Sequence, residues 1–441
     1  MLMFRTLLAI AVAAIATPAA AETVVIHAGR LLATPGAAPL EKQTIIVRDD
    51  KIAEVRAGFI DPAAVGADGR LVDLSQQFVL PGMMDLHAHI TMRLFQPRPG
   101  RITDSVTMRP ADLALRAAVS ARQVLLSGFT TIRDLGAPHD VIFPLRDALN
   151  AGMFPGPHII AAGSMLSRTG GHGDPHLLRP ELRMHIEDYG KPCSGVAACR
   201  EGVRERVADG ADVIKISVSG SGSDETGNAS AEPDLLPDEL ETIIATAKSL
   251  NRRVAAHVTS TKGINAAVRA GVTTIEHGTY ADKESFALMK QKGVILVPTT
   301  YVSVFLDKPS IQAGLKPEEW TFLSAAIKRA RQLPGEAYRA GVKIALGTDA
   351  GGDLDANRAQ ELELYVQSGL PASEAIKTAT VNAAEALGMS DRLGQIKPGF
   401  RADIIAVTGD PLADVKLLST VDFVMKDGRV YKSGGQPTVQ P

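Results

Sequence analysis

The sequence predicts an α/β protein: a (β/α)8 TIM barrel accompanied by a small β-sandwich that both termini form together. Eight short, nearly continuous apolar runs alternate with alanine-rich amphipathic segments over roughly three hundred residues, as a helix-covered parallel sheet requires. Polar residues close most of these runs, where the chain would leave the barrel. No Gly-x-Gly-x-x-Gly motif follows the first run, which argues against an open dinucleotide-binding sheet.

The expected barrel domain spans residues 81–397, and its strands and helices alternate along the chain. Strands are expected at 83–89, 129–134, 158–163, 213–218, 253–257, 272–277, 294–299 and 342–349. The amphipathic segments expected to cover them include 111–126, 196–208, 237–250, 262–270 and 317–340.

The first barrel strand ends in His87-x-His89, within the run Pro81-Gly-Met-Met-Asp-Leu-His-Ala-His-Ile90. Side chains alternate between the two faces of a strand, so these imidazoles point the same way and can chelate one divalent cation. Such a pair is weak by itself, because most pairs of this kind are surface or core accidents. Its significance comes from the residues that end the later strands.

Four later strands carry Lys215, His257, His277 and Asp349 at or near their ends. Chemistry in a (β/α)8 barrel takes place at the C-terminal ends of the strands, so these residues are expected to meet the first pair. His257 taken alone is more often a satisfied core histidine. Lys215 lies inside Val-Ile-Lys-Ile, where burying an unpaired ammonium costs several kcal/mol unless the group is neutralised. A neutral lysine can react with carbon dioxide to give an anionic, bidentate carbamate that would bridge two metals.

These residues stand in motifs that resemble the metal-dependent amidohydrolase superfamily in its dinuclear, carbamylated-lysine form. The matching segments are PGMMDLHAHI, VIKIS, VAAHV, TIEHG, ALGTDAG and, near the end, LGQIKPGFRADIIAV. The resemblance covers essentially the whole mature chain. It implies a more buried metal on His87, His89 and Asp349, and a more exposed metal on His257 and His277.

The same resemblance implies a mechanism and a branch of the superfamily. N6-carboxylysine at Lys215 and a hydroxide would bridge the two divalent ions, which lower the pKa of the shared water. Asp349 would accept the hydroxide proton and deliver it to the leaving amine. The loop Gly170-Gly-His-Gly-Asp174 looks like that of Xaa-Pro dipeptidases and ochratoxin-hydrolysing amidases, and His172 would donate to the developing oxyanion. The alternative for His172 is a plain solvent-exposed loop residue.

The expected reaction is hydrolysis of a C–N amide bond in a small substrate bearing a carboxylate: a dipeptide, an N-acyl amino acid or an ochratoxin-like amide. Zinc suits imidazole and carboxylate ligands best, with manganese and cobalt as alternatives. Arg168 is a candidate partner of the substrate carboxylate, although an exposed loop arginine is commonly just solvated. Tyr301, after the seventh strand, is a further candidate substrate contact. From the resemblance we also expect a homo-oligomer that associates through its outer helices.

Three alternatives to this hypothesis remain open. A hydrolytic deaminase of the same superfamily would normally use one metal and lack Lys215. A lactonase or phosphotriesterase would share the dinuclear site, and only assays separate it from an amidase. A catalytically silent metal-binding barrel is disfavoured, because every expected ligand position is filled.

We expect no nucleic acid as a partner, because a formal net charge of −2 gives no electrostatic footprint for it. The segment 217–234, which is Gly/Ser-rich at 219–224, lacks the ending of a phosphate-binding loop, so we expect a flexible loop at the mouth of the site.

The two termini carry separate information. Residues 1–21 are typical of a secretory signal peptide: Arg5 precedes an apolar run too short to span a membrane, and Ala19-Ala-Ala21 offers a cleavage site. The mature protein is expected to be secreted or periplasmic and to have no stable membrane span, with an uncleaved anchor as the alternative. Cys193 and Cys199 could then form a disulfide, but the sequence leaves their pairing open. Segments 22–80 and 398–435 are each too small for a robust core, so we expect them to combine in one β-sandwich domain.

Overall fold

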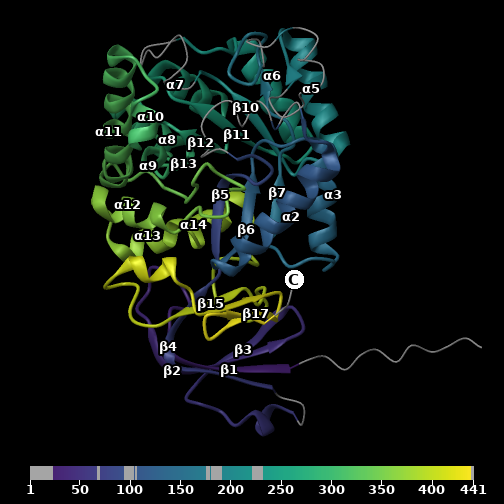
Figure 1. Cartoon of the computed structure of the whole chain (residues 1–441), viewed down its shortest axis with the longest axis vertical. Coiled ribbons are helices and arrows are strands. Elements are labelled where there is room, and N and C mark those ends of the chain that lie inside the picture. The colour runs from purple at the N-terminus through teal and green to yellow at the C-terminus, as the bar shows by residue number, and fades with distance from the viewer. Residues whose placement is uncertain are drawn as a thin grey trace, which may run out of the picture.

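The computed structural model describes residues 23–66, 70–93, 104, 107–174, 179, 191–220 and 232–438. The expected signal peptide and most of the segment 219–224 lie outside these residues. Two parts stack on each other: an α/β body, and a sheet of terminal strands below it (Figure 1). Within the described ranges, no helix is long and apolar enough to cross a membrane.

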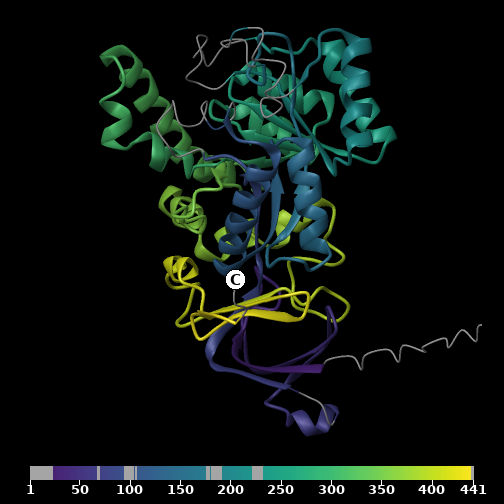
Figure 2. The ribbon, with the colours of Figure 1, turned by 45° about the vertical axis from the view of Figure 1, so that its right-hand side comes forward.

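The body contains parallel strands with helices on their outer side (Figures 1 and 2). Its strands are β5 (Met83–His89), β6 (Phe129–Asp134), β7 (His158–Ala161), β8 (Leu166–Ser167), β9 (Lys191–Pro192), β10 (Val213–Ser217), β11 (Arg253–Val258), β12 (Thr274–His277), β13 (Ile295–Val297) and β14 (Ala350–Gly351). Its helices are α2 (Pro110–Leu126), α3 (His139–Asn150), α5 (Val196–Asp209), α6 (Pro237–Ser249), α7 (Thr261–Ala270), α8 (Lys283–Lys292), α9 (Val302–Leu306), α10 (Pro309–Gln312), α11 (Pro317–Arg339), α12 (Gln360–Ser368), α13 (Ala372–Thr378) and α14 (Val381–Leu387).

The five amphipathic segments expected from the sequence form α2, α5, α6, α7 and α11, with ends that differ by one residue at most. Local signals explain the boundaries. At the start of α7, for example, the Ser260 side chain accepts a hydrogen bond from the backbone N–H of Gly263. Gly271 ends the same helix in the left-handed conformation, with φ 99°, which glycine adopts at little cost.

The body strands form two parallel sheets, with the orders β13-β12-β11-β10-β8-β9 and β14-β5-β6-β7. At one junction the N–H of Asp212, just before β10, donates to the carbonyl oxygen of Ala161 in β7 at 2.8 Å. At the other junction, segment 342–349 lies between β13 and β5. Ala345 donates to the carbonyl oxygen of Leu296, and Leu86 donates to that of Leu346, both at 2.9 Å. The arrangement is therefore of the TIM-barrel type.

The prediction of a regular eighth strand at 342–349 is wrong. This segment makes a single isolated β-bridge, between Ile344 and Leu296. The groups at its end bond to a side chain instead. The N–H and the hydroxyl of Thr348 donate to the carboxylate of Asp85 at 3.0 and 2.6 Å. The third expected strand also ends early, at Ala161, and the short strand β8 follows it.

The terminal segments form one eight-stranded sheet with the order β18-β17-β16-β15-β4-β1-β2-β3. Its strands are β1 (Thr23–Leu31), β2 (Leu40–Arg48), β3 (Lys51–Ala57), β4 (Arg70–Pro81), β15 (Ile404–Val407), β16 (Phe423–Lys426), β17 (Arg429–Ser433) and β18 (Gln436–Pro437), with 3-10 helices at Pro62–Val65 and Val415–Ser419. Antiparallel pairing of β15 with β4 joins the two termini, and both contribute to one buried apolar cluster that includes Val47 and Phe423. The expected combination is thus observed as one hydrogen-bonded sheet, and a two-layer sandwich stays a prediction.

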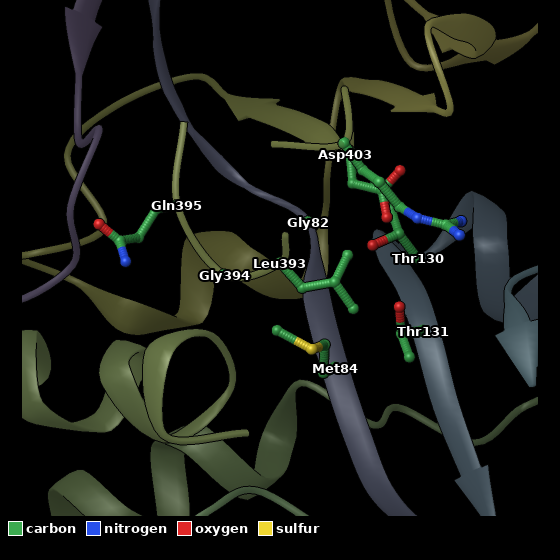
Figure 3. A pocket seen from close by; sticks show the side chains of 9 residues that line it. Gly82, Met84, Thr130, Thr131, Leu393, Gly394, Gln395 and Asp403 are labelled. Atoms are coloured by element: carbon green, nitrogen blue, oxygen red, sulfur yellow. The ribbon is translucent and has the colours of Figure 1, made fainter. Parts of the chain in front are cut away.

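A small hollow lies where the body meets the terminal sheet, at the foot of β5 and β6 (Figure 3). Gly82, Met84 and Thr130 line it, and the N–H of Gly82 donates to the carbonyl oxygen of Asp403 at 2.9 Å. The strands β5 and β6 therefore start at the terminal sheet. Their C-terminal ends, which carry the candidate site, therefore point away from the terminal sheet (Figure 1).

Candidate metal centre

The first three expected ligands form one cluster at the ends of β5 and of segment 342–349. Asp349 Oδ1 lies 3.2 Å from His89 Nε2 and 3.6 Å from His87 Nε2. One ligand atom from each of these residues lies within 4.8 Å of the others, an arrangement that could hold a metal ion. Asp349 turns toward the pair from a left-handed backbone, with φ 56°. The HxH pair therefore faces one point, as strand alternation predicts.

Three histidines use Nδ1 for a hydrogen bond and keep Nε2 for the centre. His87 Nδ1 lies 2.9 Å from Glu276 Oε2, and His89 Nδ1 lies 3.1 Å from the carbonyl oxygen of Gly136. His277 Nδ1 lies 2.7 Å from the hydroxyl oxygen of Thr299. Partners of this kind fix the proton on Nδ1 and leave the Nε2 lone pair free to bind a metal.

His257 and His277 bring the second expected pair to the same place. Their ring centroids are 4.5 Å apart, and those of His87 and His277 are 4.9 Å apart. His257 is 5% exposed, and among the described residues its buried Nε2 has no hydrogen-bond partner. A buried, unpartnered imidazole nitrogen is costly in a finished core but is expected of a metal ligand.

Lys215 extends from β10 into this group of imidazoles. Its side chain is almost fully buried, and its Nζ lies 3.3 Å from His87 Nε2. Burial lowers the pKa of Lys215 to about 8. A neutral amine is the form that reacts with carbon dioxide, so the position suits the expected carbamate.

Electrostatics keep most of the centre unprotonated. Burial lowers the pKa of His87 and of His257 well below the ordinary histidine value, and lowers that of His277 to about 3. Burial alone would raise the pKa of Asp349, but its hydrogen bond to His89 and the charges of the surrounding His89, His277 and Lys215 together outweigh this and hold the pKa below its usual value. His87, His257 and His277 are therefore in the neutral form that metals require. Burial alone would also lower the pKa of His89, but the carboxylates of Asp349 and Asp134 outweigh it and raise that pKa above its ordinary value.

The Gly170–Asp174 loop places His172 over the second pair. The loop closes on itself, because the N–H of Gly170 donates to Asp174 Oδ2 at 2.6 Å. The exposed ring of His172 stacks on that of His257 with centroids 4.1 Å apart. The strand β8, which precedes the loop, is joined to the segment that holds the Cys193–Cys199 disulfide, since the Cys193 N–H donates to the carbonyl oxygen of Ser167 at 2.7 Å.

The two expected substrate contacts are already engaged within the protein. Arg168 Nε lies 3.0 Å from Asp234 Oδ1, and its Nη1 donates to the carbonyl oxygen of Thr169. Tyr301 is buried at the N-terminus of α9, and its hydroxyl accepts a hydrogen bond from the N–H of Asn357 at 3.0 Å. Their roles toward a substrate stay predictions.

Sequence reasoning missed the charged residues behind the ligands. Arg133 and Glu276 form a buried ion pair of 2.7 Å behind His87, and Arg358 pairs with Asp85 at 2.6 Å. Arg133 and Glu276 each interrupt an apolar run, as Lys215 does. That interruption was the available signal for both of them.

Comparisons with known proteins decide the family. The Amidohydrolase family matches residues 78–431. The chain belongs to this family. Ochratoxinase from Aspergillus niger is 32% identical over 453 aligned positions, which cover 96% of this chain and 89% of that protein.

Solved structures of amidohydrolases agree with this assignment. The crystal structure of A. niger ochratoxinase matches with a TM-score of 0.83 at 30% identity, covering 96% of this chain and 98% of that one. The structure of a Xaa-Pro dipeptidase with methionine bound in the active site matches with a TM-score of 0.82 at 33% identity, covering 93% and 100%. The suspected superfamily and branch, the TIM-barrel-type fold and a hydrolytic enzyme are thereby confirmed.

Proposed function

We propose that this amidohydrolase is a metal-dependent enzyme that cleaves a C–N amide bond in a small, carboxylate-bearing substrate: a dipeptide, an N-acyl amino acid or an ochratoxin-like amide. The observation that carries the proposal is the convergence of four histidines, Lys215 and Asp349 in one buried cluster. The names of the similar proteins, an ochratoxinase and a Xaa-Pro dipeptidase, support this class of substrate.

The residues fit two divalent ions, and zinc is the metal that these ligands suit best. His87, His89 and Asp349 would hold one, and His257 and His277 the other. Lys215, as N6-carboxylysine, would bridge them. The unpartnered Nε2 of His257 and the Nδ1 hydrogen bonds of the other histidines favour metal binding over a plain hydrogen-bonded core. When bound, the ions would supply an activated water and a Lewis acid for the scissile carbonyl.

Asp349 would move the proton during the reaction. Its Oδ1 faces both imidazoles of the HxH pair, so the carboxylate is at the centre of the cluster. It would accept the proton of the attacking water and deliver it to the leaving amine. His172 would donate a hydrogen bond to the oxyanion, since its exposed ring covers His257 at the open side of the cluster.

The proposal extends to the organisation and location of the protein. A catalytic domain, 81–397, would stand on a β-sandwich domain built from 22–80 and 398–435. The signal-like residues 1–21 support export to the periplasm or the medium.

A hydrolysis screen tests the proposed reaction. Purified, zinc-loaded protein would be assayed against N-acyl amino acids, dipeptides and ochratoxin-like amides, with lactones and phosphotriesters in parallel. The proposal expects chelator-sensitive amide cleavage, and expects Asp349→Asn to abolish it. Chelator-sensitive cleavage of lactones or phosphotriesters, with no amide hydrolysis, would overturn the substrate class and leave the metal site standing.

A further inference from the structure

The side chain of Arg133 crosses the interior of the body and joins three strands. It comes from β6 and is 1% exposed. Its Nη2 lies 2.7 Å from Glu276 Oε1 in β12, and its Nη1 lies 3.1 Å from the hydroxyl oxygen of Thr274 in the same strand. Its Nε donates to the carbonyl oxygen of Leu86 in β5 at 2.6 Å. Each of the three guanidinium nitrogens therefore has a protein partner.

The bond to Leu86 coincides with an irregularity in β5. The pairing of β5 with β6 shifts register between Asp85 and Ala88, so Leu86 and His87 have no ladder partner in β6. Irregularities of this kind re-aim side chains near active sites. The guanidinium of Arg133 donates a hydrogen bond to the carbonyl oxygen of Leu86, and thereby fixes the backbone immediately before His87.

Glu276 uses both of its carboxylate oxygens in this network. Oε1 accepts from Arg133 and from the hydroxyl of Thr274, and Oε2 faces His87 Nδ1 at 2.9 Å. A carboxylate beside a guanidinium is an acceptor only, so His87 must carry its proton on Nδ1. The Nε2 lone pair of His87 is then directed toward Lys215 and Asp349.

His87 differs from the other ligands in the charge of its partner. His89 and His277 donate to a backbone carbonyl and to a hydroxyl, which are neutral. The anion behind His87 raises the basicity of the ring and fixes its orientation, as carboxylate partners of metal-bound histidines do. The cation of Arg133 offsets the cost of burying that anion.

We propose that Arg133 and Glu276 are positioning residues that hold His87 as the fixed, Nδ1-protonated ligand from which the metal centre assembles. The inference rests on the proposed metal centre and assigns it two residues beyond the expected ligands. A purely structural ion pair would affect folding and leave metal affinity unchanged.

Zinc affinity and unfolding, measured together, separate these two roles. Zinc affinity would be measured by competition with a chromogenic chelator, and stability by urea unfolding of the metal-free protein. Glu276→Gln keeps the shape of the side chain but lets His87 place its proton on either nitrogen, so we expect zinc to bind about 10- to 100-fold more weakly. Arg133→Met leaves the buried carboxylate of Glu276 without its cation, so it should lower the urea concentration at the unfolding midpoint.

The double variant Arg133→Met/Glu276→Gln removes both charges. We expect it to regain much of the stability lost in Arg133→Met while zinc binding stays weak. The matched control is Arg146→Met/Asp212→Asn, which removes an ion pair of 2.8 Å that touches no expected ligand. It should leave zinc affinity unchanged.

The outcomes distinguish this inference from the proposed function. If the wild-type chain binds zinc and the double variant binds it equally well, the positioning role is wrong and the metal centre stands. If the wild-type chain binds no divalent ion, the proposed centre and this inference are both wrong.

Discussion

Thr299 and His277 connect the ends of two neighbouring strands through a hydrogen bond of 2.7 Å between the threonine hydroxyl and the imidazole Nδ1. The hydroxyl donates its own hydrogen to the carbonyl oxygen of Pro298 at 2.8 Å, so it must accept from Nδ1. Both residues have left-handed backbones, with φ 51° and 66°. Such conformations cost about 1–3 kcal/mol each in residues other than glycine and concentrate at functional sites.

The first prediction concerns this acceptor. Thr299→Val keeps the shape of the side chain but removes the oxygen, so His277 can rotate or place its proton on Nε2. We expect kcat/KM on the substrate identified by the screen to fall about 10- to 100-fold. Thr299→Ser retains the hydroxyl and should stay near wild type. Equal activity in the valine and serine variants would show that the hydrogen bond does not matter.

The second prediction concerns proton transfer. Asp349→Asn removes the proton acceptor and one expected metal contact, so turnover should fall by orders of magnitude while KM changes much less. Steady-state kinetics on metal-loaded protein, with metal content measured in parallel, separates the two effects. Near-normal turnover would remove Asp349 from the mechanism.

The third prediction concerns His172. If its ring donates directly to the oxyanion, His172→Ala should lower turnover on amides by roughly 10²- to 10³-fold. Because the ring stacks on His257 from an exposed loop, folding and metal content should change little. The matching measurement is kcat with metal content held equal. A wild-type kcat in the alanine variant would show that His172 is a solvated loop residue with no part in the reaction.

The convergence of the candidate ligands could be predicted because it follows from general rules of strand and barrel geometry. Strand alternation directs His87 and His89 to one side, and the barrel brings all strand ends to one face. The ends of helices could be predicted equally well, because a capping residue such as Ser260 bonds to a backbone group only a few positions away. Asp427 and Gly428 both have positive φ values, and an Asp-Gly pair is typical of such a hairpin turn, so this turn too depends on neighbouring residues alone.

The contacts behind the ligands could not be predicted, because they join distant parts of the chain. Glu276 meets His87 across 189 positions, and Arg358 meets Asp85 across 273. The end of the irregular segment 342–349 depends on a contact of the same kind, because Thr348 donates to Asp85 across 263 positions. A single sequence shows that Glu276 and Arg133 interrupt apolar runs, but not which partner each one finds.

The fourth prediction concerns stability and pH at the junction with the terminal sheet. His158 in β7 faces Asp403 and Asp427 at 3.5 and 3.3 Å, and Arg401 and Lys426 both lie beside Asp427. Burial alone would lower the pKa of His158, but the two carboxylates outweigh it and raise that pKa above its ordinary value. A raised histidine pKa contributes stability that is fully present below the unfolded value of about 6.5 and is lost as pH rises through the folded value.

Urea unfolding of wild type and His158→Gln checks this sign. The wild-type advantage in the free energy of unfolding should be largest near pH 6 and should shrink toward pH 9. An advantage that stays constant or grows over that range would contradict the assignment.

Metal stoichiometry tests the central claim most directly. The wild-type chain, loaded with zinc, freed of excess metal and supplied with bicarbonate, would be measured by elemental analysis beside Lys215→Ala. A carboxylysine bridge at the buried Lys215 predicts two divalent ions per wild-type chain and a marked loss of metal and activity in the variant. One ion per wild-type chain, with full activity in Lys215→Ala, would contradict the dinuclear centre.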